Sequence, residues 1–121
     1  MFRRPQVPTI DGTEASRRLA AGGTPTPLLL DIREPNDFLA FRAPGALLRP
    51  VSTLHLTVAE LPKDRPIMVA CWEGNTSQGV TEYLLRSGWT DVVSVAGGMN
   101  GWRHAGLPVR EGPLGPGEGE L

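Results

Sequence analysis

The sequence is poor in cysteine, in long apolar runs and in excess charge of either sign. Its 121 residues include a single cysteine, Cys71, and two histidines, His55 and His104. One cysteine cannot form an internal disulfide, and with two widely separated histidines it cannot assemble a structural zinc site. We therefore expect no metal and no cofactor, and any chemistry of Cys71 uses the protein backbone or a second molecule.

Charge and targeting signals exclude several classes of partner. Lysine and arginine number 12, aspartate and glutamate 13, and the formal net charge is −1. The basic residues are scattered among the acids, so no positive stripe is present for a nucleic-acid backbone. The opening residues, MFRRPQVPTIDG, contain no apolar stretch of the length of a secretory signal. We expect a cytoplasmic protein that binds neither nucleic acid nor a membrane.

Short apolar runs alternate with helical patterns along the chain. This alternation predicts one α/β domain with a mostly parallel sheet of four or five strands. Three runs are nearly continuous in apolar residues and are predicted as buried strands: LLLDI (28–32), IMVAC (67–71) and DVVSV (91–95). Two weaker candidates, QVPTI (6–10) and GALLR (45–49), lie next to prolines and suit sheet edges.

Four segments between these runs are predicted as helices. They are GTEASRRLAAGG (12–23), capped by Asp11 or Thr13 and stopped by the pair Gly22-Gly23, and the segments 34–41, 77–87 and 99–105. In the third, Val80, Tyr83, Leu84 and Leu85 are expected to form the apolar side. The domain is predicted to span residues 1–108. The segment 109–121 is rich in glycine, proline and glutamate, a composition that favours a mobile tail without chemistry.

Cys71 ends a predicted buried strand and lies six residues before a predicted helix. This position puts its sulfur at the carboxyl edge of a parallel sheet, where ligand sites of open α/β folds lie. Gly74 can adopt backbone angles closed to other residues, and Asn75 tolerates the left-handed region. The loop can therefore curl round the sulfur with its N–H groups inward. Together with a helix N-terminus capped by Thr76 or Ser77, these groups would stabilise a nucleophilic thiolate.

A plainer interpretation of Cys71 is a small packing residue at the end of a buried strand, since cysteine is among the most buried residue types. The glycine, the asparagine and the two hydroxyl residues that follow it favour the activated thiol instead. This geometry is the one that activates a cysteine without a histidine base.

Three separated motifs resemble the rhodanese family, in the order in which that family has them. CWEGNTS resembles its active-site loop, LLLDIREPNDF with the later PGA (44–46) its upstream Asp-x-Arg segment, and VVSVAGGMNGW its late strand and Gly-Gly turn. The resemblance covers roughly residues 9–109. It implies a rhodanese-like fold with helices on both faces of the sheet, similar to the single-domain thiosulfate sulfurtransferases of bacterial cytoplasm.

The resemblance also implies a reaction and a set of site residues. Cys71 would be the nucleophile that takes a sulfane sulfur from thiosulfate or another donor, carries it as a persulfide, and passes it to a thiophilic acceptor such as cyanide or a thiol. The active-site loop would hold these anions; its residues are Trp72, Glu73, Gly74, Asn75, Thr76 and Ser77. Asp31 and Arg33 would support the site from below. A thioredoxin-like or sulfur-relay protein is a further expected partner.

Three other functions remain open. A phosphatase of the Cys-x5-Arg type is disfavoured, because no arginine lies between Cys71 and Tyr83 to clamp a phosphoryl group. A persulfide carrier between proteins is favoured modestly by Trp72 and Glu73, which replace the basic residues that would meet thiosulfate. A non-catalytic interaction module would require Cys71 to be inert.

Residues outside the loop receive plainer assignments. Arg42 and Arg49 are expected to be solvated surface arginines. Trp102 and the pair Gly97-Gly98 are assigned to packing and to turn geometry. His55 and His104 are expected to be surface or packing residues.

Overall fold

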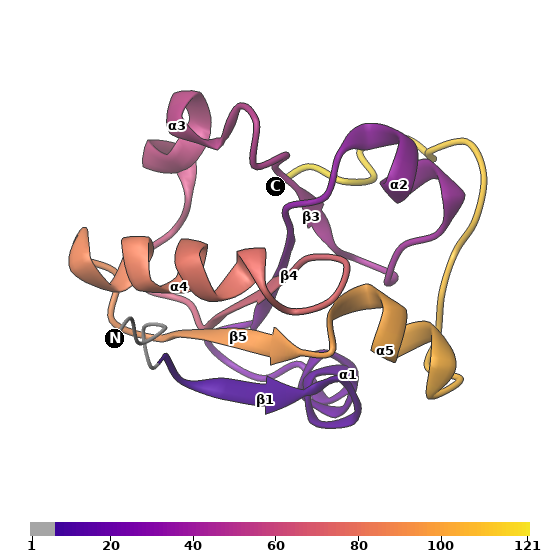
Figure 1. Ribbon diagram of the computed structural model, residues 1–121, viewed down its shortest axis with the longest axis horizontal. Coiled ribbons are helices and arrows are strands. Elements are labelled where there is room, and N and C mark those ends of the chain that lie inside the picture. The colour runs from indigo at the N-terminus through magenta and orange to yellow at the C-terminus, as the bar shows by residue number, and fades with distance from the viewer. Residues whose placement is uncertain (1–6) are drawn as a thin grey trace, which may run out of the picture.

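The computed structural model describes residues 7–121 and has a five-stranded sheet at its centre (Figure 1). Every strand pair is parallel, and the order across the sheet is β1-β5-β4-β2-β3. The strands are β1 (Thr9–Asp11), β2 (Leu28–Asp31), β3 (Leu47–Leu48), β4 (Ile67–Ala70) and β5 (Val92–Ala96). The predicted α/β class and parallel sheet are confirmed, and the two weaker candidate strands form the edges. Gln6, in the first of these candidates, lies outside the described residues.

Helices cover both faces of the sheet. They are α1 (Gly12–Ala21), α2 (Pro35–Ala40), α3 (Leu54–Thr57) followed by the 3-10 turn η1 (Val58–Glu60), α4 (Thr76–Arg86) and α5 (Gly98–His104). One face packs against α3 and α4 in a core cluster that contains Leu54 and Leu84. The other face packs against α1, α2 and α5 through Ala15, Phe38 and Trp102. Within residues 7–121, no helix combines the length and the apolar content needed to cross a membrane.

The two central strands, β2 and β4, are buried along their whole length. Their side chains alternate between the two core clusters, with Leu28 and Leu30 in one and Leu29 in the other, which explains why these sequences are continuous in apolar residues. Because all strands run the same way, their carboxyl ends meet at one edge of the sheet. Cys71 follows β4 directly and so lies at that edge.

The helix predictions hold with local exceptions. The carboxylate of Asp11 caps α1 by accepting a hydrogen bond from the Glu14 N–H at 2.8 Å, as predicted. Placing Tyr83 on the apolar side of α4 was wrong, since it is 49% exposed. The buried side instead follows helical spacing from the first turn and consists of Ser77, Val80, Thr81 and Leu84. Helix α3 and η1 were not predicted, because four and three residues are too few to show a period.

Arg42 and Arg49 are not the solvated arginines that we expected. The side chain of Arg42 is 1% exposed and that of Arg49 16%. Arg42 pairs with Glu118 through two hydrogen bonds of 2.7 and 2.8 Å and donates another of 2.7 Å to the carbonyl of Gly112. A buried guanidinium needs such acceptors, and both partners belong to the C-terminal segment.

Residues 109–121 pack against the domain, although their composition favoured mobility. Figure 1 shows this segment, in yellow, passing from α5 along α2 to β3. The N–H of Leu48 donates to the Gly119 carbonyl at 2.8 Å, so the segment covers the open edge of β3. Its order derives from backbone pairing and from the buried ion pair with Arg42, not from apolar content. These contacts run across the predicted boundary at residue 108.

Candidate active site

Three hydrogen-bonding groups converge on the sulfur of Cys71. The backbone N–H groups of Gly74 and Ser77 lie 3.2 and 3.3 Å from Sγ, and the hydroxyl of Ser77 lies 3.4 Å from it. The Ser77 N–H is in the first turn of α4, where backbone donors have no acceptor within the helix. Cys71 is 7% exposed and borders the apolar core, so little water can solvate a thiolate there. These donors supply the solvation that burial removes.

The Ser77 hydroxyl is itself paired with a second buried hydroxyl. Ser77 Oγ and Ser94 Oγ are 2.7 Å apart, and either can donate. Both residues are fully buried. When Cys71 is a thiol, its S–H can donate to Ser77 Oγ; when it is a thiolate, the Ser77 hydroxyl can turn and donate to sulfur while Ser94 donates to Ser77. The pair can therefore serve both protonation states without moving a heavy atom.

The start of α5 holds the backbone of the cysteine loop. The N–H of Met99 donates to the Cys71 carbonyl at 2.7 Å, and the N–H of Asn100 donates to the Trp72 carbonyl at 3.0 Å. Gly98, with φ of 57°, lies against these carbonyls, and a β-carbon there would overlap both oxygens. The absence of a side chain at Gly98 lets the two segments approach and orients the first two peptide planes of the loop.

The loop turns at Gly74 and closes on α4. Gly74 has a φ of 91°, whereas Asn75 has a φ of −88° and does not use the left-handed region. A β-carbon at Gly74 would lie 2.9 Å from the Gly97 nitrogen, so the site needs glycine on steric grounds as well. The side chain of Gln78 donates to the Gly74 carbonyl at 2.9 Å. The helix begins at Thr76, so the hydroxyl of Ser77 contacts the sulfur and does not occupy the N-cap position.

Asp31 and Arg33 form a buried pair beneath Trp72. Their side chains are each 1% exposed, and the Arg33 guanidinium donates to the carboxylate at 2.9 Å and to the Phe41 carbonyl at 2.6 Å. The guanidinium also stacks on the rings of Phe41 and Trp72, at 4.7 and 5.1 Å from their centroids. Among the described residues, its Nη1 has no hydrogen-bond partner. Arg33 thus holds Trp72, the residue after the cysteine, in place by stacking on its ring.

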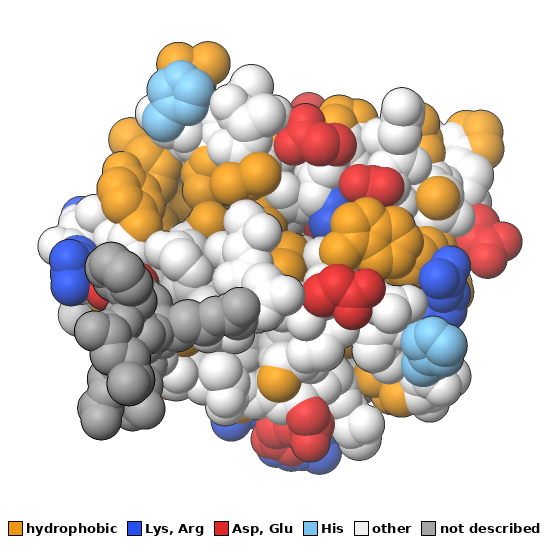
Figure 2. Space-filling view, in the orientation of Figure 1, with side chains coloured by type: hydrophobic (Ala, Val, Ile, Leu, Met, Phe, Trp, Pro, Cys, Tyr) orange, Lys and Arg blue, Asp and Glu red, His pale blue; other side chains and the backbone are white. Residues whose placement is uncertain are grey.

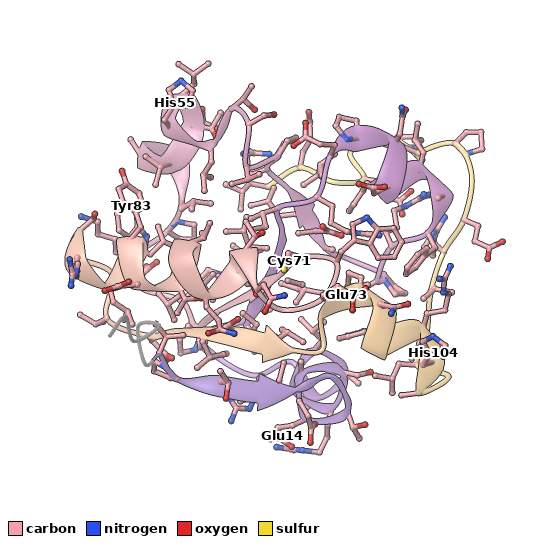
Figure 3. The ribbon with its side chains drawn as sticks, viewed as in Figure 1. Glu14, His55, Cys71, Glu73, Tyr83 and His104 are labelled. Atoms are coloured by element: carbon pink, nitrogen blue, oxygen red, sulfur yellow. The ribbon has the colours of Figure 1, made fainter. Side chains whose placement is uncertain are left out.

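A pocket of about 180 Å³ opens beside the sulfur. It is lined by residues that follow β2, β3 and β4 in the chain: Ile32, Arg33, Glu34, Asp37, Val51, Cys71, Trp72 and Thr76. Glu73 is exposed, and its carboxylate accepts from the Asn100 amide at 3.3 Å. Figure 3 shows Cys71 at the centre of this face with Glu73 close to it in the view. Of the predicted site residues, Arg33, Trp72 and Thr76 therefore share one pocket with the cysteine.

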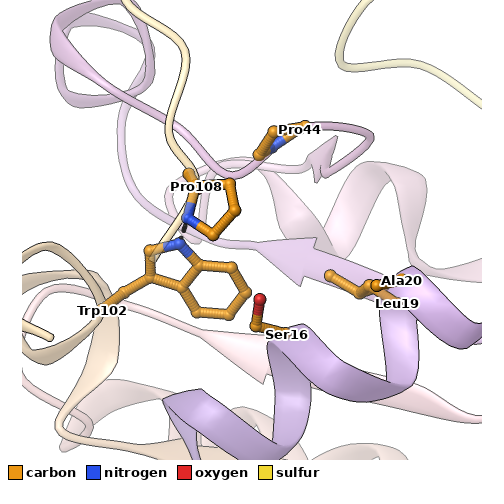
Figure 4. Close-up of a pocket in the computed structure, with 6 residues that line it drawn as sticks. All are labelled: Ser16, Leu19, Ala20, Pro44, Trp102 and Pro108. Carbon is orange, nitrogen blue, oxygen red and sulfur yellow. Dashed lines mark hydrogen bonds between the residues drawn. The ribbon is translucent and has the colours of Figure 1, made fainter. Parts of the chain in front are cut away.

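A second cavity, of about 290 Å³, lies elsewhere between α1, α5 and the segment before β3 (Figure 4). Its lining is mainly apolar and consists of Ser16, Leu19, Ala20, Pro44, Trp102 and Pro108. The indole N–H of Trp102 donates to the Pro108 carbonyl at 2.8 Å, so its polar atom is already paired. None of these lining residues is titratable.

Sequence reasoning missed Ser94 and underestimated Gly98. In the sheet, Ser94 pairs with Val69, which places its side chain on the same face as Val69 and Cys71. A lone serine inside VVSVA was the available signal, but it required the strand register. The assignment of Gly97-Gly98 to turn geometry is confirmed, with φ of 80° and 57°, and Trp102 is buried. His55 and His104 are both exposed.

A family model for the rhodanese-like domain matches residues 12–105. The chain belongs to the rhodanese-like family. This match spans every element that builds the site, from the start of α1 to the end of α5.

Individual relatives agree with this placement. A thiosulfate sulfurtransferase GlpE of Tolumonas auensis is 41% identical over 80 residues, which are 66% of this chain and 76% of that protein. A rhodanese-related protein from Thermoplasma volcanium superposes with a TM-score of 0.77 at 27% identity, over 85% of this chain and 97% of that one. A thiosulfate sulfurtransferase from Pseudomonas aeruginosa gives the same TM-score and identity, over 89% of this chain but only 21% of that longer one.

Proposed function

We propose that the protein is a sulfurtransferase that carries sulfane sulfur as a persulfide on Cys71. The observation that carries this proposal is the convergence of the Gly74 and Ser77 N–H groups and the Ser77 hydroxyl on one sulfur. A hydrogen bond to a charged group contributes roughly 1.5–3 kcal/mol, so this set can hold a thiolate in a buried site. The 41% identity to a thiosulfate sulfurtransferase supports the same reaction class.

The proposed reaction has two steps. The Sγ thiolate attacks the outer sulfur of thiosulfate; the Sγ–S bond forms, the S–S bond of thiosulfate breaks, and its electron pair leaves with sulfite. The terminal sulfur of the persulfide now bears the negative charge, which the loop N–H groups can stabilise. An acceptor such as cyanide then attacks that sulfur, leaves as thiocyanate and restores the thiolate. Asp31 and Arg33 contribute to this scheme by fixing Trp72.

Mass spectrometry of the intact protein tests the proposal. After exposure to thiosulfate or a persulfide donor, the mass should rise by that of one sulfur atom, and cyanide should remove it as thiocyanate. Cys71→Ser should gain no sulfur while its circular dichroism spectrum stays native. If the serine variant gains sulfur equally, the proposed mechanism is wrong.

A persulfide carrier between proteins is a second candidate, favoured by the carboxylates and the tryptophan at the pocket. It differs from the first in its partner and not in the cysteine chemistry. Thiosulfate turnover would then be slow while sulfur from a protein persulfide reached Cys71 quickly. A non-catalytic module is the third, and failure of every donor to modify Cys71 would establish it.

A further inference from the structure

The pocket beside Cys71 presents acidic side chains to whatever approaches the sulfur. Glu34 and Asp37 both line it, and Glu73 projects from the loop next to the cysteine. Figure 2, in the orientation of Figure 3, shows acidic side chains gathered round an apolar patch on this face. Acidic groups at a pocket mouth raise the local concentration of cations and lower that of anions.

Only one positive group lines the pocket, and its charge is already balanced. Among the described residues, no lysine and no arginine besides Arg33 contributes to the lining, and Arg33 pairs with buried Asp31. Arg103 packs on the rings of Phe41 and Trp72, at 4.5 and 5.9 Å from their centroids, but it does not line the pocket. Within the lining, the only cation near Glu34 and Asp37 among the described residues is therefore Arg33, which is already paired.

Arg33 offers a second, independent indication of the ligand. The residue is 4% exposed, lines the pocket, and carries a buried Nη1 without a hydrogen-bond partner among the described residues. An unpaired donor of a buried guanidinium is costly unless a ligand supplies an acceptor. The pocket, at about 180 Å³, has room for a group of few atoms. A compact acceptor such as a carboxylate or a peptide carbonyl suits it.

We propose that the sulfur donor of this site is a thiol persulfide, RS–SH, in which the R group has both a hydrogen-bond-accepting oxygen and a positive charge close to the sulfur. Cysteine persulfide has both groups. The inference rests on the proposed persulfide chemistry of Cys71 and names its substrate class. The oxygen acceptor pairs with Arg33, and the ammonium or basic group faces Glu34 and Asp37. Thiosulfate, a dianion, can offer an oxygen to Arg33 but has no positive charge to face Glu34 and Asp37.

The transfer step balances without a further reagent. The Sγ thiolate attacks the outer sulfur of RS–SH, the Sγ–S bond forms, and the RS–S bond breaks. Its electron pair leaves with RS⁻, which takes the proton and departs as RSH, while Cys71 keeps the sulfur as a persulfide anion. A free cysteine persulfide and a protein cysteine persulfide beside a lysine share this chemistry.

A matched set of freshly generated persulfides tests the charge requirement on the full chain. Cysteamine persulfide and 3-mercaptopropionate persulfide have the same chain length but end in an ammonium and a carboxylate; cysteine persulfide has both groups. The measurement is the second-order rate of sulfur addition to Cys71, by rapid quench and mass spectrometry, at low and high salt. Each rate is divided by that of the same persulfide with a free small thiol. A peptide bearing a cysteine persulfide beside a lysine distinguishes the free from the protein-borne source.

The expected result is a roughly tenfold preference for the cysteamine over the mercaptopropionate donor at low salt, which shrinks as salt rises. Cysteine persulfide should equal or exceed cysteamine persulfide. In Glu34→Gln/Asp37→Asn the preference should fall to within about twofold, as expected when two screened charges are removed. The control Asp64→Asn/Asp91→Asn changes net charge equally at exposed residues before β4 and β5, far from the carboxyl edge, and should keep the preference.

Two other results overturn the inference in different ways. If the carboxylate donor reacts as fast as the ammonium donor, or if the preference survives in Glu34→Gln/Asp37→Asn, the acidic lining does not select the donor, although Cys71 still carries sulfur. If no donor modifies Cys71 at all, the proposed function fails along with the inference.

Discussion

Replacing Ser77 with alanine removes the hydroxyl that lies 3.4 Å from the sulfur of Cys71 while leaving the backbone donors of Gly74 and residue 77 in place. A hydrogen bond to a charged group contributes roughly 1.5–3 kcal/mol, and the O–S separation of 3.4 Å is long, so we take the low end. About 1.4 kcal/mol corresponds to a tenfold change in thiolate population at fixed pH. The more basic thiolate is the better nucleophile, which recovers about half of this loss on a logarithmic scale.

The expected result for Ser77→Ala is therefore an iodoacetamide alkylation rate roughly threefold below that of the wild type, at a pH where the thiol predominates. The substitution also leaves Ser94 Oγ buried without its partner, which costs roughly 1–3 kcal/mol of stability in urea unfolding. The double variant Ser77→Ala/Ser94→Ala should recover stability but not reactivity. The rate of persulfide formation should rank the wild type, Ser77→Ala and the double variant in the same order as the alkylation rate does.

Two outcomes would refute this reasoning. Equal alkylation rates for Ser77→Ala and the wild type would show that the hydroxyl does not stabilise the thiolate. Recovery of the rate in the double variant would attribute the loss to the unpaired Ser94 hydroxyl. Circular dichroism and urea unfolding of each variant establish that the comparison is between folded proteins.

Three further predictions concern the residues that support the site and the C-terminal segment. Gly98→Ala should distort the cysteine loop and abolish persulfide formation, whereas Gly101→Ala, whose β-carbon would meet no atom within 4 Å, should keep it; sulfur addition by mass spectrometry checks both. Asp31→Asn should cost roughly 3 kcal/mol in urea unfolding, because it leaves Arg33 buried without its counter-charge. The Arg42 guanidinium, with the Gly115 N–H, lowers the pKa of Glu118 from 4.5 to about 2. A carboxyl whose pKa is lower in the folded state stabilises the fold above pH 4.5 and loses this effect as the pH falls towards 2. Glu118→Gln should therefore flatten the dependence of the unfolding free energy on pH between about 2 and 4.5, which urea unfolding at several pH values measures.

The central strands and the cysteine loop were predictable because their signals are local. The runs at 28–32 and 67–71 are apolar at nearly every residue, short and each preceded by a proline, a pattern typical of a strand buried on both faces. Gly74 was predictable for the same reason, since a strand end and a helix start six residues apart demand a sharp turn between them. In each case neighbours in the sequence determine the conformation.

The C-terminal segment and the hydroxyl pair were not predictable, because their partners are distant in sequence. Residues 109–121 contain few apolar side chains, and their order depends on Arg42, 76 residues before Glu118. Ser77 in α4 and Ser94 in β5 are 17 residues apart, and they meet because α4 packs on the face of the sheet to which the register of β4 and β5 directs Ser94. No periodicity in the sequence indicates either contact. The composition of residues 109–121 therefore favoured a mobile tail, and Ser94 was treated as an ordinary residue of its strand.

The same distinction explains why the chemistry proposed for Cys71 could be inferred from the sequence, whereas the selectivity proposed for its pocket required the structure. The donors to the sulfur come from the six residues after it, so the loop sequence alone implies a stabilised thiolate. The charge that an incoming donor meets comes also from Glu34 and Asp37, which reach the pocket because β2 lies beside β4 in the sheet. On the two proposals above, a relative could keep the loop and the proposed persulfide chemistry while changing these two carboxylates and, with them, its preferred sulfur donor. Exchanging Glu34 and Asp37 for lysines should then increase the rate of sulfur transfer from thiosulfate to Cys71 without altering the rate at which iodoacetamide alkylates the cysteine.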